Sequence, residues 1–224
     1  MQTINKGRGS RRRKATWPHR LLWLAGAALL VGADRGVRAD EPDAATAARA
    51  RYVAMTVCGT CHGVTGNSTY PKFPRLAGQD AKYLVKQLKT FHEQTRGDPD
   101  AIAYMWGMAS QLNDETIDVL AKYYAAQKAE SSPARDPATI ARGREVYEHG
   151  VAAQGVPACA TCHGPDAHGM ADFPRLAGQH AQYVLKQLAS FQSNMRNVAV
   201  MHGVVQNLHL ADMQAVAAYL EAQP

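Results

Sequence analysis

The four cysteines of the chain form two Cys-x-x-Cys pairs, and a histidine directly follows each pair. The two motifs are Cys58-Gly-Thr-Cys61-His62 and Cys159-Ala-Thr-Cys162-His163. A disulfide or thioredoxin-like redox pair explains the spacing but not the repeated histidine. A zinc site of four thiolates leaves both histidines unused and ties together halves that otherwise look independent. The attachment sequence for c-type haem uses every one of these residues, so this reading is preferred.

Each motif therefore predicts one covalently bound haem c, which makes two per chain. We expect the thiols of each pair to add across the two vinyl groups of the porphyrin, so that Cys58, Cys61, Cys159 and Cys162 carry thioether links. The adjacent side chains, His62 and His163, are then placed under the iron as axial ligands.

These motifs belong to a longer internal repeat. Residues 73–88 read FPRLAGQDAKYLVKQL and residues 173–188 read FPRLAGQHAQYVLKQL, an offset of 100 residues. The order of all matching segments is the same in both halves. The pattern indicates one small module that has been duplicated, because a unit near 90 residues can hold its own core.

The repeat also selects the second axial ligand of each iron. Met105 and Met201 are the only methionines that coincide when the copies are aligned, and they follow their histidines by 43 and 38 residues. His202 could compete at the second iron, but the first copy has Trp106 there. A thioether opposite an imidazole favours ferrous iron and raises the reduction potential. An iron with both positions filled passes electrons, whereas an open one binds small ligands.

Two further pairs of residues recur after the haem motifs. Pro74 and Pro174 have a free carbonyl that can accept a hydrogen bond from the axial histidine's other ring nitrogen, although a simple turn proline is the alternative. Arg75 and Arg175 could neutralise haem propionates through charge-assisted hydrogen bonds, with a solvated surface arginine as the alternative.

The elements that must position these side chains are helices, so we predict an all-α fold of two tandem cytochrome c-like domains, each wrapped around one covalent haem. Tyr83 and Tyr183 are interpreted as packing residues, and Asn113 as an N-cap. The expected helices span 44–57, 79–94 and 113–127 in the first copy and 139–149, 179–193 and 210–221 in the second. The expected organisation is a leader over 1–39, domains over 40–130 and 138–224, and a proline-containing linker over 131–137.

The leader accounts for the basic character of the chain. Of the 224 residues 46% are hydrophobic and 20% charged, and the formal charge is +6, but residues 1–39 contain nine Lys and Arg against one acid. The remainder has a formal charge of −2, which argues against nucleic-acid binding. A basic start followed by the apolar run Leu21–Val31 predicts an export signal cleaved after Ala39 and a periplasmic protein. An uncleaved membrane anchor is the alternative, although the run is short of the roughly 20 residues that span a bilayer.

Taken together, the two Cys-x-x-Cys-His-Gly motifs, the two FPRLAGQ blocks and the two Met-x-Gly segments make the chain resemble the dihaem cytochromes c4 over residues 50–222. The resemblance implies two class I cytochrome c folds facing each other, with haem propionates near the interface. It also implies Met105 and Met201 as sixth ligands, with Pro74 and Pro174 matching the family's prolines. One departure is that the second copy has Gly143 where the first has Ala50.

The function that follows is electron transport rather than enzymatic catalysis. The resemblance implies an exported respiratory carrier, in the periplasm or associated with the membrane, with a membrane cytochrome complex or terminal oxidase as its redox partner. One alternative is the cytochrome subunit of a periplasmic dehydrogenase complex that oxidises sulfide or an alcohol. Another is a haem peroxidase or thiosulfate oxidase, which requires one iron to be open or unusually ligated.

Overall fold

The expected all-α fold is confirmed by a computed structural model, which describes residues 44–134 and 136–224. Within these ranges the regular structure is helical, and β-type pairing is confined to two isolated bridges, Val151 with Val156 and Met170 with Phe173. None of the helices in the described ranges is long and apolar enough to cross a membrane. The predicted leader and its cleavage after Ala39 lie outside the described residues.

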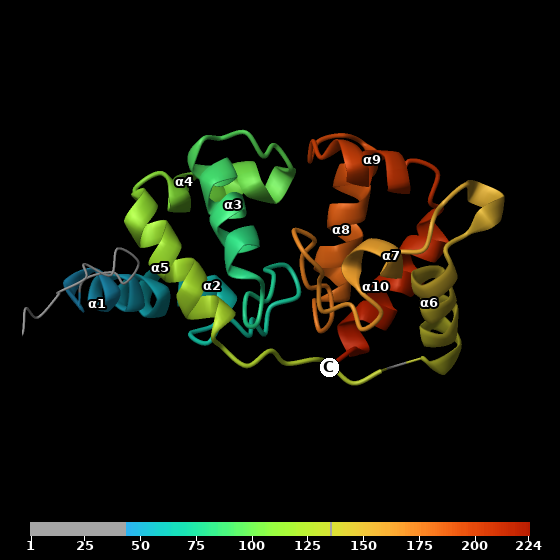
Figure 1. The fold of residues 1–224 in the computed structure, drawn as a ribbon, viewed down its shortest axis with the longest axis horizontal. Coiled ribbons are helices and arrows are strands. Elements are labelled where there is room, and N and C mark those ends of the chain that lie inside the picture. The colour runs from blue at the N-terminus through green and yellow to red at the C-terminus, as the bar shows by residue number, and fades with distance from the viewer. Residues whose placement is uncertain (1–43, 135) are drawn as a thin grey trace, which may run out of the picture. The chain divides into compact units, whose positions relative to one another are not determined.

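The first copy of the repeat, here called the first module, builds its haem motif into a continuous helical segment (Figure 1). Its elements are α1 (Ala44–Val53), π-helical η1 (Ala54–Cys58), α2 (Gly59–His62), α3 (Ala81–His92), π-helical η2 (Ala101–Met105), α4 (Trp106–Ala109) and α5 (Asp114–Ala125). Asn113 caps α5 as expected, because its side chain accepts a hydrogen bond from the backbone N–H of Thr116 at 2.9 Å. The predicted helix over 44–57 continues to His62 through a π-helical turn that the sequence pattern did not indicate.

The second module has the same order of principal helices but interrupts the first of them. Its elements are α6 (Pro137–His149), the 3₁₀ turn η3 (Ala152–Gln154), α7 (Ala160–His163), α8 (Ala181–Gln192), α9 (Ala199–Val205) and α10 (Leu210–Ala222). Helix α6 begins at Pro137, the last residue of the expected linker, because proline suits the first helical position and Asp136 caps it. It ends at His149, and the residue that follows, Gly150, has a φ of +74°, which favours glycine.

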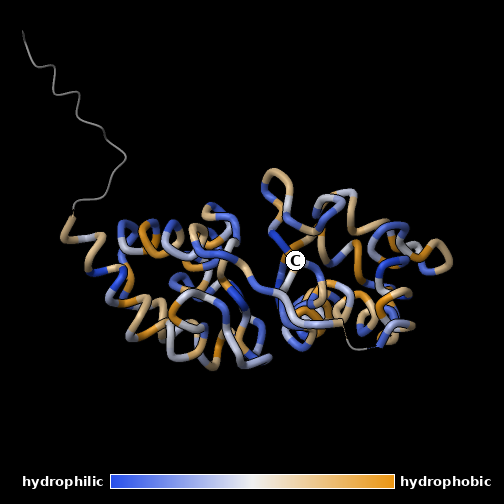
Figure 2. Tube along the Cα trace, turned by 90° about the horizontal axis from the view of Figure 1, so that it is seen from below, coloured by the Kyte–Doolittle hydropathy of each residue, from blue (hydrophilic) through white to orange (hydrophobic). Residues whose placement is uncertain are grey.

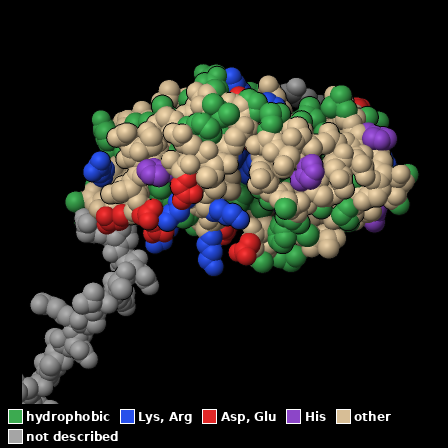
Figure 3. All heavy atoms as spheres, turned by 90° about the horizontal axis from the view of Figure 1, so that it is seen from above, with side chains coloured by type: hydrophobic (Ala, Val, Ile, Leu, Met, Phe, Trp, Pro, Cys, Tyr) green, Lys and Arg blue, Asp and Glu red, His purple; other side chains and the backbone are tan. Residues whose placement is uncertain are grey.

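Each module has its own apolar core, and apolar and polar stretches alternate along the helices of both (Figure 2). Leu84, Leu120 and Tyr124 lie in the core of the first module, and Tyr147 and Phe191 in that of the second. On the face drawn in Figure 3, acidic and basic side chains lie next to one another, in keeping with the nearly balanced charge after the leader.

The glycine noted in the sequence lets two helices approach closely. A Cβ on Gly143 of α6 would lie 2.1 Å from the carbonyl oxygen of Ala215 on α10, which no side chain can tolerate without movement. At the equivalent position of the first module, the Ala50 side chain is fully buried against the core. The α6–α10 crossing in the second module therefore depends on glycine, while the first module accommodates a methyl group there.

Candidate functional site

The two cysteine pairs lie at corresponding helical turns, η1 with α2 and the start of α7. All four thiols are partly buried and unbridged. Burial raises the pKa of the Cys58 thiol, and it raises that of the Cys159 thiol to about 11. In the described part of the chain, no three His, Cys, Asp or Glu side chains gather as a metal site would require. The cysteines are thus held apart as two pairs, each beside its own histidine.

Each of these histidines is buried and oriented by the proline that the sequence singled out. His62 is 6% exposed and its Nδ1 lies 2.8 Å from the carbonyl oxygen of Pro74. His163 is 7% exposed and its Nδ1 lies 3.0 Å from that of Pro174. Because a carbonyl can only accept, Nδ1 carries the proton and Nε2 keeps its lone pair. Burial lowers the pKa of both imidazoles despite these hydrogen bonds, so the neutral, metal-binding form is favoured.

The predicted methionines lie in the helices that follow. Met105 ends η2 and lines the same cavity as His62, so the structure brings this pair together. Met201 lies in α9 and packs against the core of the second module. The competing side chain, His202, has its Nδ1 2.9 Å from the carbonyl oxygen of Phe191. A thioether and an imidazole facing one cavity form a donor set that suits haem iron.

The two arginines after the prolines make hydrogen bonds to backbone carbonyls. Arg75 donates to the carbonyl oxygens of Gly178 and Glu130, and its buried Nε has no hydrogen-bond partner. Arg175 donates to the carbonyl oxygens of Ala177 and Pro224. Burial lowers the pKa of both guanidinium groups. Neither side chain is freely solvated, and Arg75 retains one buried donor that a carboxylate could satisfy.

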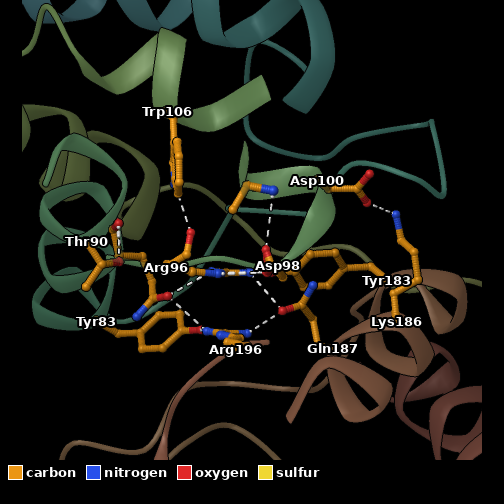
Figure 4. Close-up of polar contacts among 12 residues, drawn as sticks. Tyr83, Thr90, Arg96, Asp98, Asp100, Trp106, Tyr183, Lys186, Gln187 and Arg196 are labelled. Carbon is orange, nitrogen blue, oxygen red and sulfur yellow. Dashed lines mark hydrogen bonds and ion pairs between the residues drawn. The ribbon is translucent and has the colours of Figure 1, made fainter. Parts of the chain in front are cut away.

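The sequence analysis missed a buried polar network that joins the modules (Figure 4). Arg96 and Arg196, 7% and 5% exposed, come from equivalent positions of the repeat. The Gln87 side-chain oxygen accepts from Arg96 at 2.8 Å and from Arg196 at 2.9 Å. The Gln187 oxygen accepts from the same two guanidinium groups at 2.8 and 2.7 Å. The recurrence of these four residues at an offset of 100 was the available signal.

This network contains more positive than negative charge. Arg96 pairs with Asp98 at 2.8 Å, whereas Val198 occupies the equivalent position beside Arg196. Buried charges are normally paired, because their removal from water is costly. Both Arg96 and Asp98 line the cavity that contains His62 and Met105. The excess cation at this interface therefore favours an anionic group nearby.

The two tyrosines interpreted as packing residues also take part in the network. The Tyr83 hydroxyl accepts from Arg196 at 2.8 Å, and the Tyr183 hydroxyl accepts from Arg96 at 3.3 Å. Burial opposes ionisation of Tyr83, but the charges of Arg196 and Arg96 outweigh it and lower its pKa. Packing alone was thus an incomplete interpretation, since a buried phenol needs a hydrogen-bond partner. A further ion pair, between Lys186 and Asp100, also joins the modules (Figure 4).

Comparison with known proteins gives consistent matches. The Cytochrome c family model matches the chain twice, over residues 47–126 and 140–223. The chain is 39% identical over 189 residues to the cytochrome c4 of Stutzerimonas stutzeri, covering 80% of this chain and 90% of that relative. It is 37% identical over 174 residues to a thiosulfate dehydrogenase electron acceptor of Thiomonas intermedia, covering 75% of this chain and 78% of the relative. The crystal structure of reduced recombinant cytochrome c4 from Pseudomonas stutzeri is similar with a TM-score of 0.71 and 37% identity, over 80% of this chain and 98% of that one.

Proposed function

The chain belongs to the cytochrome c family, among its dihaem cytochromes c4, and on that premise we propose that it is an exported carrier that donates electrons to a terminal oxidase. Its cofactors are two haem c groups, and it is an electron-transfer protein rather than an enzyme. The observation that supports the proposal most directly is the cavity shared by the neutral His62 and Met105, in a module that occurs twice.

In the first module, Cys58 and Cys61 would hold the porphyrin covalently, and His62 and Met105 would bind its iron. The corresponding residues of the second module are Cys159, Cys162, His163 and Met201. When bound, each haem supplies an iron that accepts and releases one electron. The prolines fix the orientation of the imidazoles, while Phe73 and Phe173 lie edge-on to the two rings at centroid distances of 6.1 and 5.8 Å and contribute apolar walls.

The polar groups at the interface would neutralise the propionates. Arg75 offers its unpaired Nε–H, and the pair Arg96 and Arg196 exceeds the single carboxylate of Asp98. Arg175 remains proposed for the same role in the second module. Carboxylates beside these groups would complete charge-assisted hydrogen bonds in a region shielded from water.

The expected leader supports placement in the periplasm, with a mature protein that starts after Ala39. Mass spectrometry of the N-terminus after expression with a cytochrome c maturation system tests this directly. A mature chain that starts at Met1 would contradict export with cleavage.

The oxidase proposal is tested by mixing the reduced, matured protein with oxidase-containing membranes of the source organism in aerated buffer. We expect the protein to be reoxidised, which is measured as the loss of its reduced absorption bands, and we expect cyanide to inhibit this reaction. Reoxidation no faster than in buffer alone would contradict a terminal oxidase as the acceptor.

A second candidate is the electron acceptor of a dehydrogenase, and the relative named a thiosulfate dehydrogenase electron acceptor favours it. This candidate predicts reduction of the oxidised protein by the purified dehydrogenase with its substrate. It also predicts co-elution of the two proteins in gel filtration of native extract, if they form a stable complex. Elution of the cytochrome only at the size of the free chain would favour a free carrier.

A further inference from the structure

The second module carries a buried histidine where the first carries a helix-capping aspartate. Asp80 accepts a hydrogen bond from the backbone N–H of Tyr83 at 2.7 Å and so caps α3. Its equivalent, His180, precedes α8 without forming a side-chain cap and is only 3% exposed. Its ring is turned instead toward the first module. The repeat is therefore asymmetric at this position, and capping does not explain the histidine.

Both ring nitrogens of His180 face groups that accept hydrogen bonds. Nε2 lies 2.8 Å from the carbonyl oxygen of Ser68, in the loop after His62. Nδ1 lies 3.2 Å from a carboxylate oxygen of Glu221, at the end of α10. A carbonyl and an ionised carboxylate cannot donate, so both contacts are hydrogen bonds only when both ring nitrogens carry protons. A neutral ring with the Nε2 proton would turn a lone pair toward the carboxylate.

A cation and a hydroxyl group lie near this carboxylate. The Arg75 guanidinium interacts electrostatically with Glu221 and donates to the Ser132 hydroxyl at 3.0 Å. That hydroxyl in turn lies 3.5 Å from the Glu221 carboxylate. Glu130, the last residue of the expected first domain, also acts electrostatically on Arg75. The Glu221 carboxylate therefore has a cation and a hydroxyl on one side and the His180 imidazole on the other.

The contact also reaches the first haem motif. The Ser68 hydroxyl donates to the carbonyl oxygen of Cys61 at 3.0 Å, and Ser68 itself is 2% exposed. Ser68 therefore contacts both the His180 ring, through its carbonyl, and the backbone of the first haem motif, through its hydroxyl. The equivalent of Glu221 in the first module is Ala125, so only one such bridge forms.

We propose that His180 is a positioning residue whose protonated ring bridges Ser68 of the first module and Glu221 of the second, which makes their association dependent on pH. The associated state holds one more proton than the separated state, so acid favours the contact and alkali weakens it. Imidazole is the side chain that ordinarily changes its charge around neutral pH, so the contact is compared on the two sides of neutrality. The inference depends on the geometry of this contact and not on the identity of the redox partner.

A double-mutant cycle on the full-length, haem-loaded protein tests the pairing. The variants His180→Gln, Glu221→Gln and the double variant are compared by chemical unfolding at pH 5 and pH 8. We expect the two side chains to be coupled by about tenfold in the unfolding equilibrium constant at pH 5, as for a hydrogen bond between charged groups. At pH 8 the coupling should fall below about twofold. Equal coupling at both pH values, or none at either, would overturn the proposal.

A spectroscopic readout keeps the test independent of stability. In the reduced protein, the ring C–H signal that disappears in His180→Gln identifies this residue by proton NMR. We expect this signal to move with pH between 5 and 8, with a midpoint that falls in Glu221→Gln. Asp80→Asn, at the equivalent position of the first module, is the matched control and should leave the titration unchanged. A signal that does not move over this range, or moves identically in Glu221→Gln, would contradict a shared proton.

Discussion

The side-chain amide of Gln79 makes both of its intermodule hydrogen bonds with the backbone of Arg175. Its oxygen accepts from the Arg175 N–H and its nitrogen donates to the Arg175 carbonyl, each at 2.9 Å. Gln179 makes the same two bonds with the backbone of Arg75, also at 2.9 Å. Each arginine directly follows the proline whose carbonyl orients the histidine of a haem motif. In each module, the residue that forms these intermodule hydrogen bonds is therefore adjacent to the proline that orients the imidazole.

Removing one of these amides should weaken the interface. Gln79→Ala leaves the N–H and carbonyl of Arg175 without their partner, and we expect a loss of about 1–3 kcal/mol in the free energy of unfolding. Gln223→Ala is the control, because the Gln223 side chain bonds only to the carbonyl of Tyr219 within its own helical end. Chemical unfolding of the haem-loaded proteins measures the difference. An equal loss in both variants would argue against a special role for the intermodule pair.

Replacing one of the proposed methionine ligands should leave one coordination position of one iron vacant. We expect Met105→Ala to lose the methionine-to-iron charge-transfer band at one haem and to bind carbon monoxide in the reduced state, because alanine offers no donor. Met108→Ala is the matched control, since Met108 lies one turn further along and is exposed. Absorption spectra before and after carbon monoxide addition distinguish the two. Carbon monoxide binding by neither variant would remove Met105 from the ligand set.

A methyl group at Gly143, where α6 crosses α10, should destabilise the second module. Gly143→Ala places a Cβ 2.1 Å from the Ala215 carbonyl oxygen, so α6 and α10 must separate, at a cost of about 1–3 kcal/mol. Gly203→Ala should instead be neutral or stabilising, because nothing lies within 4 Å of the added atom and alanine favours a helix. Thermal unfolding followed by circular dichroism measures both. If Gly143→Ala matched the control, the helices would not be in the close contact described.

The fall in the free energy of unfolding at acidic pH should depend partly on Asp212. Burial would raise its pKa, but hydrogen bonds from Arg142 at 2.8 Å and Gln154 at 2.7 Å outweigh this effect and lower it. A carboxyl group with a lowered pKa stabilises the folded state above its unfolded value of about 3.9, and the contribution is lost as pH falls toward the lowered value. We therefore expect Asp212→Asn to flatten the fall in stability below about pH 5.

The control for this prediction is Asp118→Asn, in an exposed pair with Lys122 that should contribute little. Unfolding midpoints between pH 3 and 7 provide the comparison. A steeper fall in stability at acidic pH in Asp212→Asn than in the parent protein would show that the sign of the shift is wrong.

Local patterns were sufficient to predict the longer helices of both modules and to single out the haem motifs. The shorter helices that carry the predicted methionines, η2 with α4 and α9, were not expected from the sequence. The N-cap at Asn113 depends on contacts three residues apart, and the Cys-x-x-Cys-His spacing fits within one helical turn or little more. The repeat at an offset of 100 predicted two equivalent modules without any knowledge of their contacts. The π-helical turn before Cys58 was not predicted, because no periodicity distinguishes it from an α-helix over five residues.

The sequence by itself determined that the chain carries two haem motifs, each with a histidine directly after its cysteine pair and each within a helical module, because those residues lie side by side along the chain. Only the tertiary structure decided what the modules share: the buried guanidinium groups of Arg96 and Arg196, and the contact of the His180 ring with Ser68. The residues in these contacts between modules are separated by 91 to 112 residues. A repeat shows which residues are equivalent, but folding alone brings them within hydrogen-bonding distance, where the cost of burying charge requires them to pair.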